Sequence, residues 1–121
     1  MQSINPLNGT VVKEYTTLTP SEVSEKLLEA EGAFQSWKKT SFEERSALLV
    51  KLGEVLRNRK QDLAELMAIE MGKPFEQGIA EVEKCAFCCD YYAQHAAQFL
   101  QKQLIQTDAS KSFVSFQPLG V

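Results

Sequence analysis

Apolar side chains recur at helical spacing over most of the chain. One stripe repeats every three or four positions and is typical of the buried face of a helix. It consists of Val23, Leu27, Ala30, Phe34 and Trp37. Thr19, Pro20 and Glu22 predict where this helix begins, because a hydroxyl cap, a proline at the first position and a glutamate at the third form a capping box. We therefore expect a helix from residue 20 with this stripe buried.

The same start signal returns at Ser41 and Glu44 and predicts a second helix. Its apolar face consists of Leu48, Leu52, Val55 and Leu56. The charged stretch 57–60 predicts a break, and a short third helix follows it. That helix carries Leu63, Leu66 and Met67. Gly72 and Pro74 predict its end, because a glycine adopts the left-handed cap and the residue before a proline avoids the helical conformation.

The longest helical pattern runs from about residue 75 to 101. Its apolar positions are Ile79, Val82, Ala86, Cys89, Ala93 and Ala96. Gly78 lies inside the pattern, and we expect it to weaken the first turns, since glycine is a poor helix former.

Both ends of the chain favour strands. Asn8-Gly9 before a β-branched run predicts a hairpin within 1–18, with Pro6 at a strand edge. After residue 101 the apolar period becomes two, which predicts a second hairpin over 103–121 with its connection at 107–111. The expected fold class is α+β and mostly helical: an N-terminal β-hairpin, about four helices within 19–102, and a projecting C-terminal hairpin, in one segment 1–121.

Composition limits the function classes. The 121 residues fit one domain, and the net charge of −3 argues against a nucleic-acid partner. The longest strongly apolar run, 47–50, is far shorter than the roughly 20 residues of a membrane span. The first residues lack the pattern of a secretory leader, and the three cysteines are an odd number. We therefore expect a cytoplasmic protein with reduced thiols and without a membrane partner.

A cluster of three cysteines is the first candidate for chemistry. Cys85, Cys88 and Cys89 lie in the middle of the expected helix, whereas a redox thiol favours a helix N-terminus. A zinc site needs a fourth ligand, and the single histidine, His95, is roughly 10 Å along the axis from Cys88. We favour cysteines that act as small buried apolar residues, with a thiol or metal-binding helix as an alternative.

The other candidates are weaker. His95 has no carboxylate or nucleophile on its own face and is expected to be a partly exposed helical histidine. The segment 72–74 lacks the glycine spacing of a phosphate-binding loop, and no dinucleotide-binding glycine motif occurs. Four aromatic residues favour a core or interface over an apolar tunnel. They are Phe87, Tyr91, Tyr92 and Phe99. No residue set here forms a catalytic constellation.

Several motifs occur in a recognisable order along the chain. They are Ile4-Asn5-Pro6, Asn8-Gly9, Trp37, Thr40, Arg45, Glu70-Met71-Gly72-Lys73-Pro74, Glu81-Val82, Cys89-Asp90-Tyr91-Tyr92-Ala93 and Gln117-Pro118-Leu119-Gly120-Val121. This ordered set resembles the N-terminal segment of the NAD(P)-dependent aldehyde dehydrogenase superfamily. The residues between Glu70 and His95 are most similar to succinate-semialdehyde dehydrogenases.

The resemblance implies a partial aldehyde dehydrogenase-like fold that lacks the Rossmann core and the catalytic domain. In that family the nucleophilic cysteine, the general-base glutamate, the oxyanion-hole asparagine and the cofactor-binding lysine all follow this segment. No catalytic or cofactor-binding residue therefore maps onto this chain. NAD or NADP belongs to the parent enzyme and is not expected to bind the chain alone, which is expected to be inactive.

The resemblance also implies supporting roles. Helices within 20–70 pack against the cofactor-binding domain in the family. Residues that could line the substrate entrance are Ala80, Lys84, Tyr91 and Tyr92. The hairpin 103–119 adds to a neighbouring subunit's sheet, which implies a homo-oligomer. The Ile4 carbonyl and the Glu70 carboxylate match the ligands of a monovalent cation in some members.

Two function classes follow. The first is a fragment, or the product of an interrupted reading frame, of an NAD(P)-dependent oxidoreductase that converts an aldehyde, with succinate semialdehyde the best candidate, to a carboxylic acid. Its partners are the remainder of the enzyme and further copies of itself. The alternative is an independent helical interaction module that pairs through the 103–119 hairpin.

Overall fold

The computed structural model describes residues 1–120. Its helices are α1 (Pro20–Trp37), α2 (Phe42–Asn58), α3 (Lys60–Met71) and α4 (Phe75–Phe99). Its strands are β1 (Gln2–Ile4), β2 (Val11–Glu14), β3 (Gln103–Leu104) and β4 (Phe113–Val114), and they form two antiparallel pairs, β1–β2 and β3–β4. The mostly helical α+β prediction is confirmed for these residues, while Val121, the end of the expected 103–121 hairpin, lies outside them.

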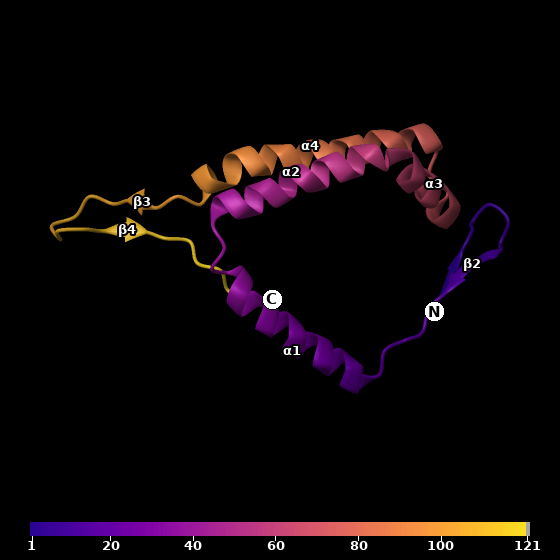
Figure 1. Ribbon diagram of the computed structural model, residues 1–121, viewed down its shortest axis with the longest axis horizontal. Helices are drawn as coiled ribbons and strands as arrows, with labels where there is room; N and C mark the ends of the chain where they lie inside the picture. Colours follow the sequence, from indigo (N-terminus) through magenta and orange to yellow (C-terminus); the bar gives the residue numbers. More distant parts are fainter. Residues whose placement is uncertain (121) are drawn as a thin grey trace.

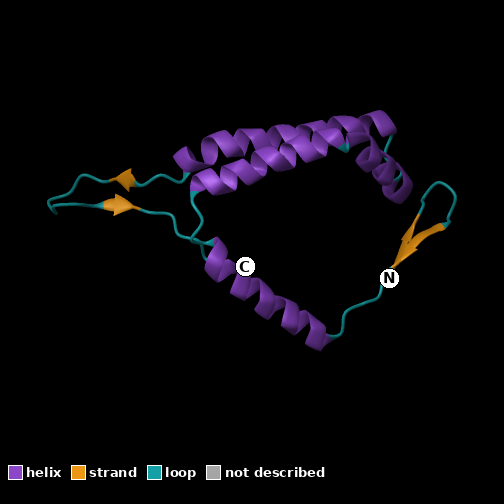
Figure 2. Cartoon of the chain, viewed as in Figure 1, coloured by secondary structure: helices purple, strands orange, loops and turns teal. Residues whose placement is uncertain are grey.

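The elements form an open arrangement rather than a closed layer structure. Helices α2 and α4 lie side by side along the longest axis, and α3 packs against the beginning of α4 (Figure 1). The β3–β4 hairpin projects from one end of this pair, and α1 stands apart from it (Figures 1 and 2). Within residues 1–120, no helix is long and apolar enough to cross a membrane.

Both predicted capping boxes form. The Thr19 hydroxyl accepts from the Glu22 amide at 3.3 Å, and the Glu22 carboxylate accepts from the Thr19 amide at 2.7 Å. Ser41 and Glu44 repeat the exchange at 3.1 and 2.7 Å. The Thr19 amide lowers the pKa of Glu22, because the hydrogen bond stabilises the carboxylate. The predicted starts of α1 and α2 are confirmed.

The core is a seam of small residues along the inner face of α4. Ala64 of α3 has no exposed surface, and a Cβ on the buried Gly78 would lie 3.0 Å from the Ala64 Cα. Val82 and Ala86 continue the seam, with 4% and 0% of their surface exposed. Gly78 therefore does more than weaken α4: the absence of a side chain lets α3 approach closely.

The prediction that the α1 stripe is buried is wrong for these residues. Val23, Leu27 and Trp37 are 44%, 62% and 49% exposed, and α1 contains no buried residue. A helical period identifies an apolar face but does not say which element covers it. Among the described residues, no element packs extensively on α1.

Most of the apolar face predicted for α2 is also exposed, and of its four residues only Leu56 is half-buried. Leu48, Leu52 and Val55 keep about half of their surface exposed. The contact with α4 instead uses a face that contains the buried Gly53, and the Ser46 hydroxyl donates to the Ala93 carbonyl at 2.8 Å. Two helices can approach closely where small and hydrogen-bonding residues meet, and this contact leaves the leucine-rich face uncovered.

The two hairpins are present but short. In the first, Gly9 has a φ of 73° and its amide donates to the Asn5 carbonyl at 2.8 Å, which confirms the turn predicted from Asn8-Gly9. In the second, the period of two predicts strands that reach Phe116, but only two residues pair on each side. A two-stranded ribbon without a covered face gains little from further pairs.

Candidate functional site

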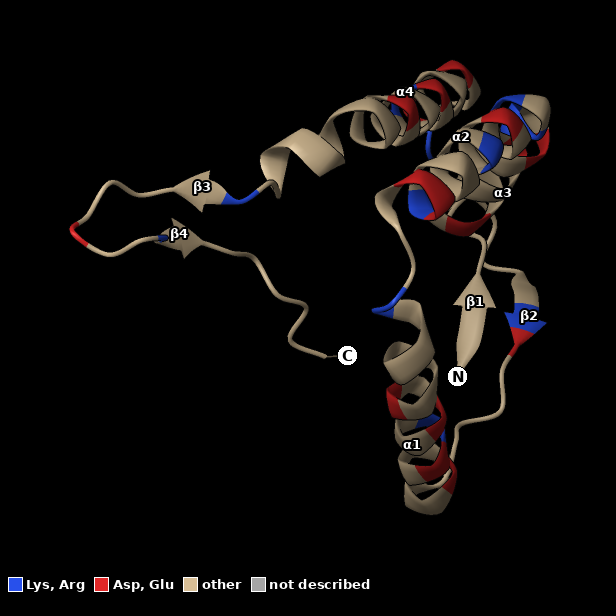
Figure 3. Ribbon diagram, turned by 60° about the vertical axis from the view of Figure 1, so that its left-hand side comes forward, with Lys and Arg blue, Asp and Glu red and all other residues tan. Residues whose placement is uncertain are grey.

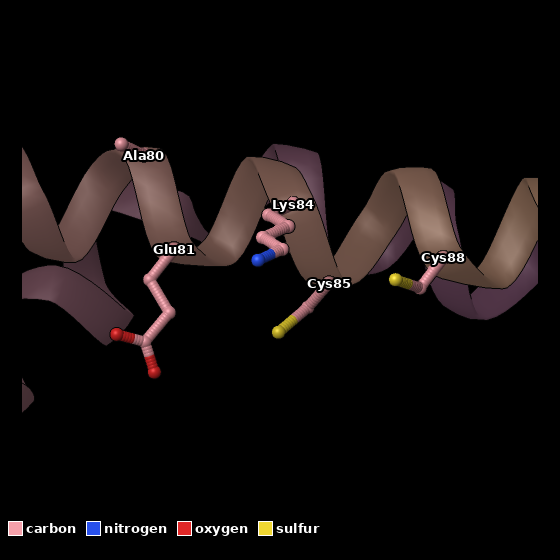
Figure 4. A pocket seen from close by; sticks show the side chains of 5 residues that line it. All are labelled: Ala80, Glu81, Lys84, Cys85 and Cys88. Atoms are coloured by element: carbon pink, nitrogen blue, oxygen red, sulfur yellow. The ribbon is translucent and has the colours of Figure 1, made fainter.

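The outer face of α4 carries an open cavity of about 640 Å³. It is lined by Ala80, Glu81, Lys84, Cys85 and Cys88. These positions lie on one side of the helix, since residues three and four apart are neighbours on its surface. Figure 4 shows these side chains along α4. Val82 and Ala86 of the buried seam are each two positions from Lys84, about half a turn around the helix, so the cavity faces away from the seam.

The charges around this cavity are not balanced. Glu81 forms an ion pair with Lys73, which precedes the proline that separates α3 from α4. Lys84 forms no ion pair with any residue of 1–120. The cavity therefore offers one uncompensated ammonium group beside the small Ala80 side chain. A strongly hydrated ammonium with three donors suits the carboxylate of a small ligand.

The cysteines correct the sequence-based expectation. All three are free; Cys85 and Cys88 are exposed and Cys89 is half-buried. The expectation of small buried residues is therefore wrong for Cys85 and Cys88, because they lie outside the register of the buried stripe through Val82 and Ala86. No group of three or more potential metal ligands occurs within residues 1–120, which leaves the zinc alternative without support.

The aromatic residues of α4 form a row on its surface. Phe87, Tyr91, His95 and Phe99 follow one another at intervals of four, with ring centroids 4.5 Å apart for Tyr91 and His95 and 5.9 Å apart for His95 and Phe99. Phe87 is 65% exposed, so the row is not part of the core of the described residues. His95 is partly exposed, as predicted.

An ion-pair network links α2, α3 and α4 near the buried Gly53. Arg57 pairs with Asp90, and Lys60 donates to Glu83 at 2.7 Å. The hydrogen bond from Lys60 lowers the pKa of Glu83, and the bond to Asp90 raises the pKa of Arg57. Figure 3 shows how charged residues gather on the helices. The sequence marked 57–60 only as a break, and the partners more than twenty residues away gave no local signal.

The structure brings the two predicted cation ligands into the same region. The Ser3 hydroxyl, next to Ile4, donates to Glu70 at 2.7 Å. A Cβ on Gly72 would lie 3.2 Å from the ring of Pro6, so the first hairpin closely approaches the end of α3. Carboxylate and carbonyl oxygens suit a hard cation, so the donor set fits. The site itself stays a prediction.

A second cavity of about 580 Å³ lies where α2 begins and α4 ends. It is lined by Lys38, Thr40, Ser41, Phe42, Arg45, Ala96, Leu100, Phe116, Gln117 and Pro118. The Arg45 guanidinium lies 4.6 Å from the centre of the Phe42 ring. Sequence reasoning missed this cavity because three separate segments of the chain form its walls.

The whole chain matches the model of a known family. Residues 1–121 match the model described as "Aldehyde dehydrogenase family". A protein of Synechocystis sp. named a probable succinate-semialdehyde dehydrogenase (NADP(+)) is 42% identical over 119 residues, which are 98% of this chain and 26% of that protein. The chain thus spans about a quarter of the length of this relative.

Solved structures agree with the sequence comparison. Succinic semialdehyde dehydrogenase from Streptococcus pyogenes, in complex with NADP+, matches with a TM-score of 0.85 and 32% identity over 93% of this chain and 25% of that one. A salicylaldehyde dehydrogenase from Pseudomonas putida G7, complexed with salicylaldehyde, matches with a TM-score of 0.89 and 28% identity over 99% and 25%. The described residues thus have the fold of the corresponding quarter of these enzymes.

Proposed function

The chain belongs to the aldehyde dehydrogenase family, and we propose that it is the N-terminal part of an NAD(P)-dependent enzyme that oxidises succinate semialdehyde to succinate. The names of the Synechocystis and Streptococcus pyogenes relatives support this substrate and NADP. The structure of the salicylaldehyde dehydrogenase matches equally well, so the choice of substrate needs support from the residues of this chain.

The observation that carries the proposal is the unpaired Lys84 at the α4 cavity. Succinate semialdehyde has an aldehyde at one end and a carboxylate at the other. Because Glu81 is already engaged by Lys73, Lys84 is free to pair with this carboxylate. Ala80 leaves room for the short aliphatic chain. The family resemblance implies a lining role at the substrate entrance for both Ala80 and Lys84.

In the proposed enzyme this chain binds and orients, and the residues that make and break bonds follow it. When bound, NAD(P)+ supplies the acceptor for the aldehyde hydride. The balanced reaction consumes one aldehyde, one NAD(P)+ and one water and yields one carboxylate, one NAD(P)H and two protons. The chain alone contributes scaffold and cavity wall and is proposed to be inactive.

Two further contributions are part of the proposal. The 103–119 segment exposes Leu104 in β3 and Phe116 after β4, at 78% and 48%, together with unpaired strand edges that favour pairing with another copy. Leu104→Arg with Phe116→Arg should dissociate the proposed homo-oligomer in sedimentation experiments, and an unchanged mass would contradict the hairpin contact.

The second contribution is a cation site. Glu70 and the Ile4 carbonyl would hold a monovalent cation that fixes the first hairpin to α3.

The central test measures NAD(P)H formation by the full-length protein with succinate semialdehyde and with butanal. Replacing Lys84 by Met should raise the KM for succinate semialdehyde about tenfold, because a charge-assisted hydrogen bond contributes about 1.5 kcal/mol or more. The KM for butanal and kcat should change little. Lys26→Met is the control, since Lys26 pairs with Glu29 on the surface of α1.

The outcomes separate the parts of the proposal. No NAD(P)H from either aldehyde would contradict the enzyme activity, and turnover of butanal alone would contradict the substrate. An unchanged KM in Lys84→Met would contradict only the role of Lys84. Pairing of the 121-residue chain with another protein without any turnover would favour an independent interaction module.

A further inference from the structure

The cavity on α4 contains two thiols that the proposed oxidation does not use. Cys85 and Cys88 are both free and exposed, and both line the same 640 Å³ cavity. Figure 4 shows the Cys88 sulfur directed back along the helix toward the turn that carries Cys85. We propose that these two thiols form a site for a trivalent organic arsenical, which binds through both sulfur atoms with its organic group in the cavity.

The spacing of the pair selects the kind of bond that it can make. Residues three apart on a helix have Cβ atoms about 5–6 Å apart, whereas a disulfide needs Cβ atoms about 3.5–4.5 Å apart. Cys85 and Cys88 therefore cannot close a direct disulfide while α4 keeps its helical geometry. One additional atom between the sulfurs spans the larger gap, and thiolates favour soft atoms in that position.

The number of ligands favours an organic arsenical over zinc. Residues 1–120 contain no group of three or more metal-ligating side chains, and structural zinc is almost always four-coordinate. An organic arsenic(III) centre needs two thiols only, because its third bond is to carbon. The pair in α4 supplies that number.

The reaction is an exchange without oxidation or reduction. An arsonous acid, R–As(OH)₂, reacts with the thiols of Cys85 and Cys88. Two As–O bonds break and two As–S bonds form, and the two thiol protons leave with the hydroxyl groups as two molecules of water. Arsenic remains trivalent and both sulfurs keep their oxidation state, so no further reactant is needed.

The surroundings of the thiols suit an aromatic group on the arsenic. Ala80 leaves space within the cavity, and the carboxylate of Glu81 is held by Lys73. The uncompensated ammonium of Lys84 provides a cation–π partner for a ring that enters the cavity. An aryl arsenical therefore combines two As–S bonds with a ring contact.

The third cysteine provides a matched control within the same peptide. Cys89 is adjacent to Cys88, but it is half-buried and does not line the cavity. Consecutive residues on a helix do not face one another. Serine at position 89 should therefore leave the site intact, whereas serine at position 85 or 88 removes one of its two ligands.

The test treats the full-length protein with phenylarsine oxide and analyses the tryptic peptide 85–102 by mass spectrometry. Wild type and Cys89→Ser should carry one phenylarsenic group with loss of both thiol hydrogens. Excess 2-mercaptoethanol should leave this label in place, and 2,3-dimercaptopropanol should remove it. In Cys85→Ser and Cys88→Ser, the 2-mercaptoethanol concentration that removes half of the label should be about 10²–10⁴-fold lower than in wild type. The reason is that the second As–S bond is lost.

Three results would overturn the site. One is a wild-type label attached through a single sulfur, and another is a monothiol-resistant label in Cys85→Ser. The third is loss of the label in Cys89→Ser at unchanged helix content by circular dichroism. Each of these readouts is independent of enzyme turnover, so a result that contradicts the dithiol site does not contradict the proposed oxidation.

Discussion

The helices α1 and α4 show how similar apolar patterns lead to different structures. Both carry apolar residues at helical spacing, but α1 buries none of them, whereas α4 buries Val82 and Ala86 and contacts two other helices. The difference lies in the partners: Gly78 and Ala64 allow α3 to approach α4 closely, whereas no described element packs extensively on α1. Among the described residues, an apolar stripe is buried only where another element covers it.

The largest expected effect comes from blocking that close approach. Gly78→Val places a branched side chain where a Cβ alone would lie 3.0 Å from Ala64. We expect the free energy of unfolding of the chain to fall by about 1–3 kcal/mol, the usual cost of overpacking. Urea denaturation measures the change. Gly32→Val on α1 is the control, because a Cβ there meets no atom within 4 Å; an equal loss in both variants would contradict the role of the contact.

A smaller effect should follow from removing a cap on α1. Thr19→Ala deletes the hydroxyl that accepts from the Glu22 amide, at a cost of about 1 kcal/mol. Since few contacts connect α1 to the other helices, the faster hydrogen exchange should be confined to α1 amides. Faster exchange in α4 as well would show that α1 and α4 unfold together, which would contradict their independence.

The ion pairs between the helices predict a dependence on acid. Lys60 lowers the pKa of Glu83, so this pair stabilises the fold above the ordinary glutamate pKa of about 4.3. The contribution is lost as pH falls through the lowered pKa. The free energy of opening in α4, obtained from amide exchange after correction for the intrinsic rate at each pH, should therefore fall more steeply with acid in wild type than in Glu83→Gln. Equal slopes in the two proteins would mean that the pair does not contribute.

The smallest expected effect concerns the exposed stripe of α1. Leu27 is 62% exposed, so Leu27→Gln should change the stability of the 121-residue chain by less than about 0.5 kcal/mol. In a full-length protein whose remainder covers α1, the same change should cost more than about 1 kcal/mol. Thermal unfolding of both forms measures this difference, and equal small effects would show that α1 faces solvent in both.

Local signals predicted local structure well. Thr19 and Ser41 identified the starts of two helices and Gly72 the end of a third, because caps and stops depend on neighbours in the sequence. The same reasoning failed for the α1 stripe and for Cys85 and Cys88, since burial depends on which elements meet. The Gly78–Ala64 contact was not predicted, because a glycine within a helix indicates only low helix propensity when the residue that packs against it is unknown.

The candidate site was only partly visible in the sequence. The ordered motifs indicated the family, and Ala80 and Lys84 were expected near a substrate entrance. Glu81 is engaged by Lys73 of the segment between α3 and α4, whereas Lys84 has no ion-pair partner in residues 1–120. Which of these neighbouring charged residues finds a partner depends on where the folded chain places their side chains, and the sequence pattern alone does not contain that placement.

The Gly53 contact has a consequence for sequence variation among relatives. A Cβ at this position would lie 3.1 Å from the Asp90 carboxylate and 3.3 Å from the Ala86 carbonyl. A larger residue at 53 would press on the Asp90 carboxylate, so the two positions should covary although they lie 37 positions apart in the sequence. Relatives that keep an acid at position 90 should keep glycine at 53 more often than those that lose it, while the Ala86 carbonyl limits any replacement to a small residue.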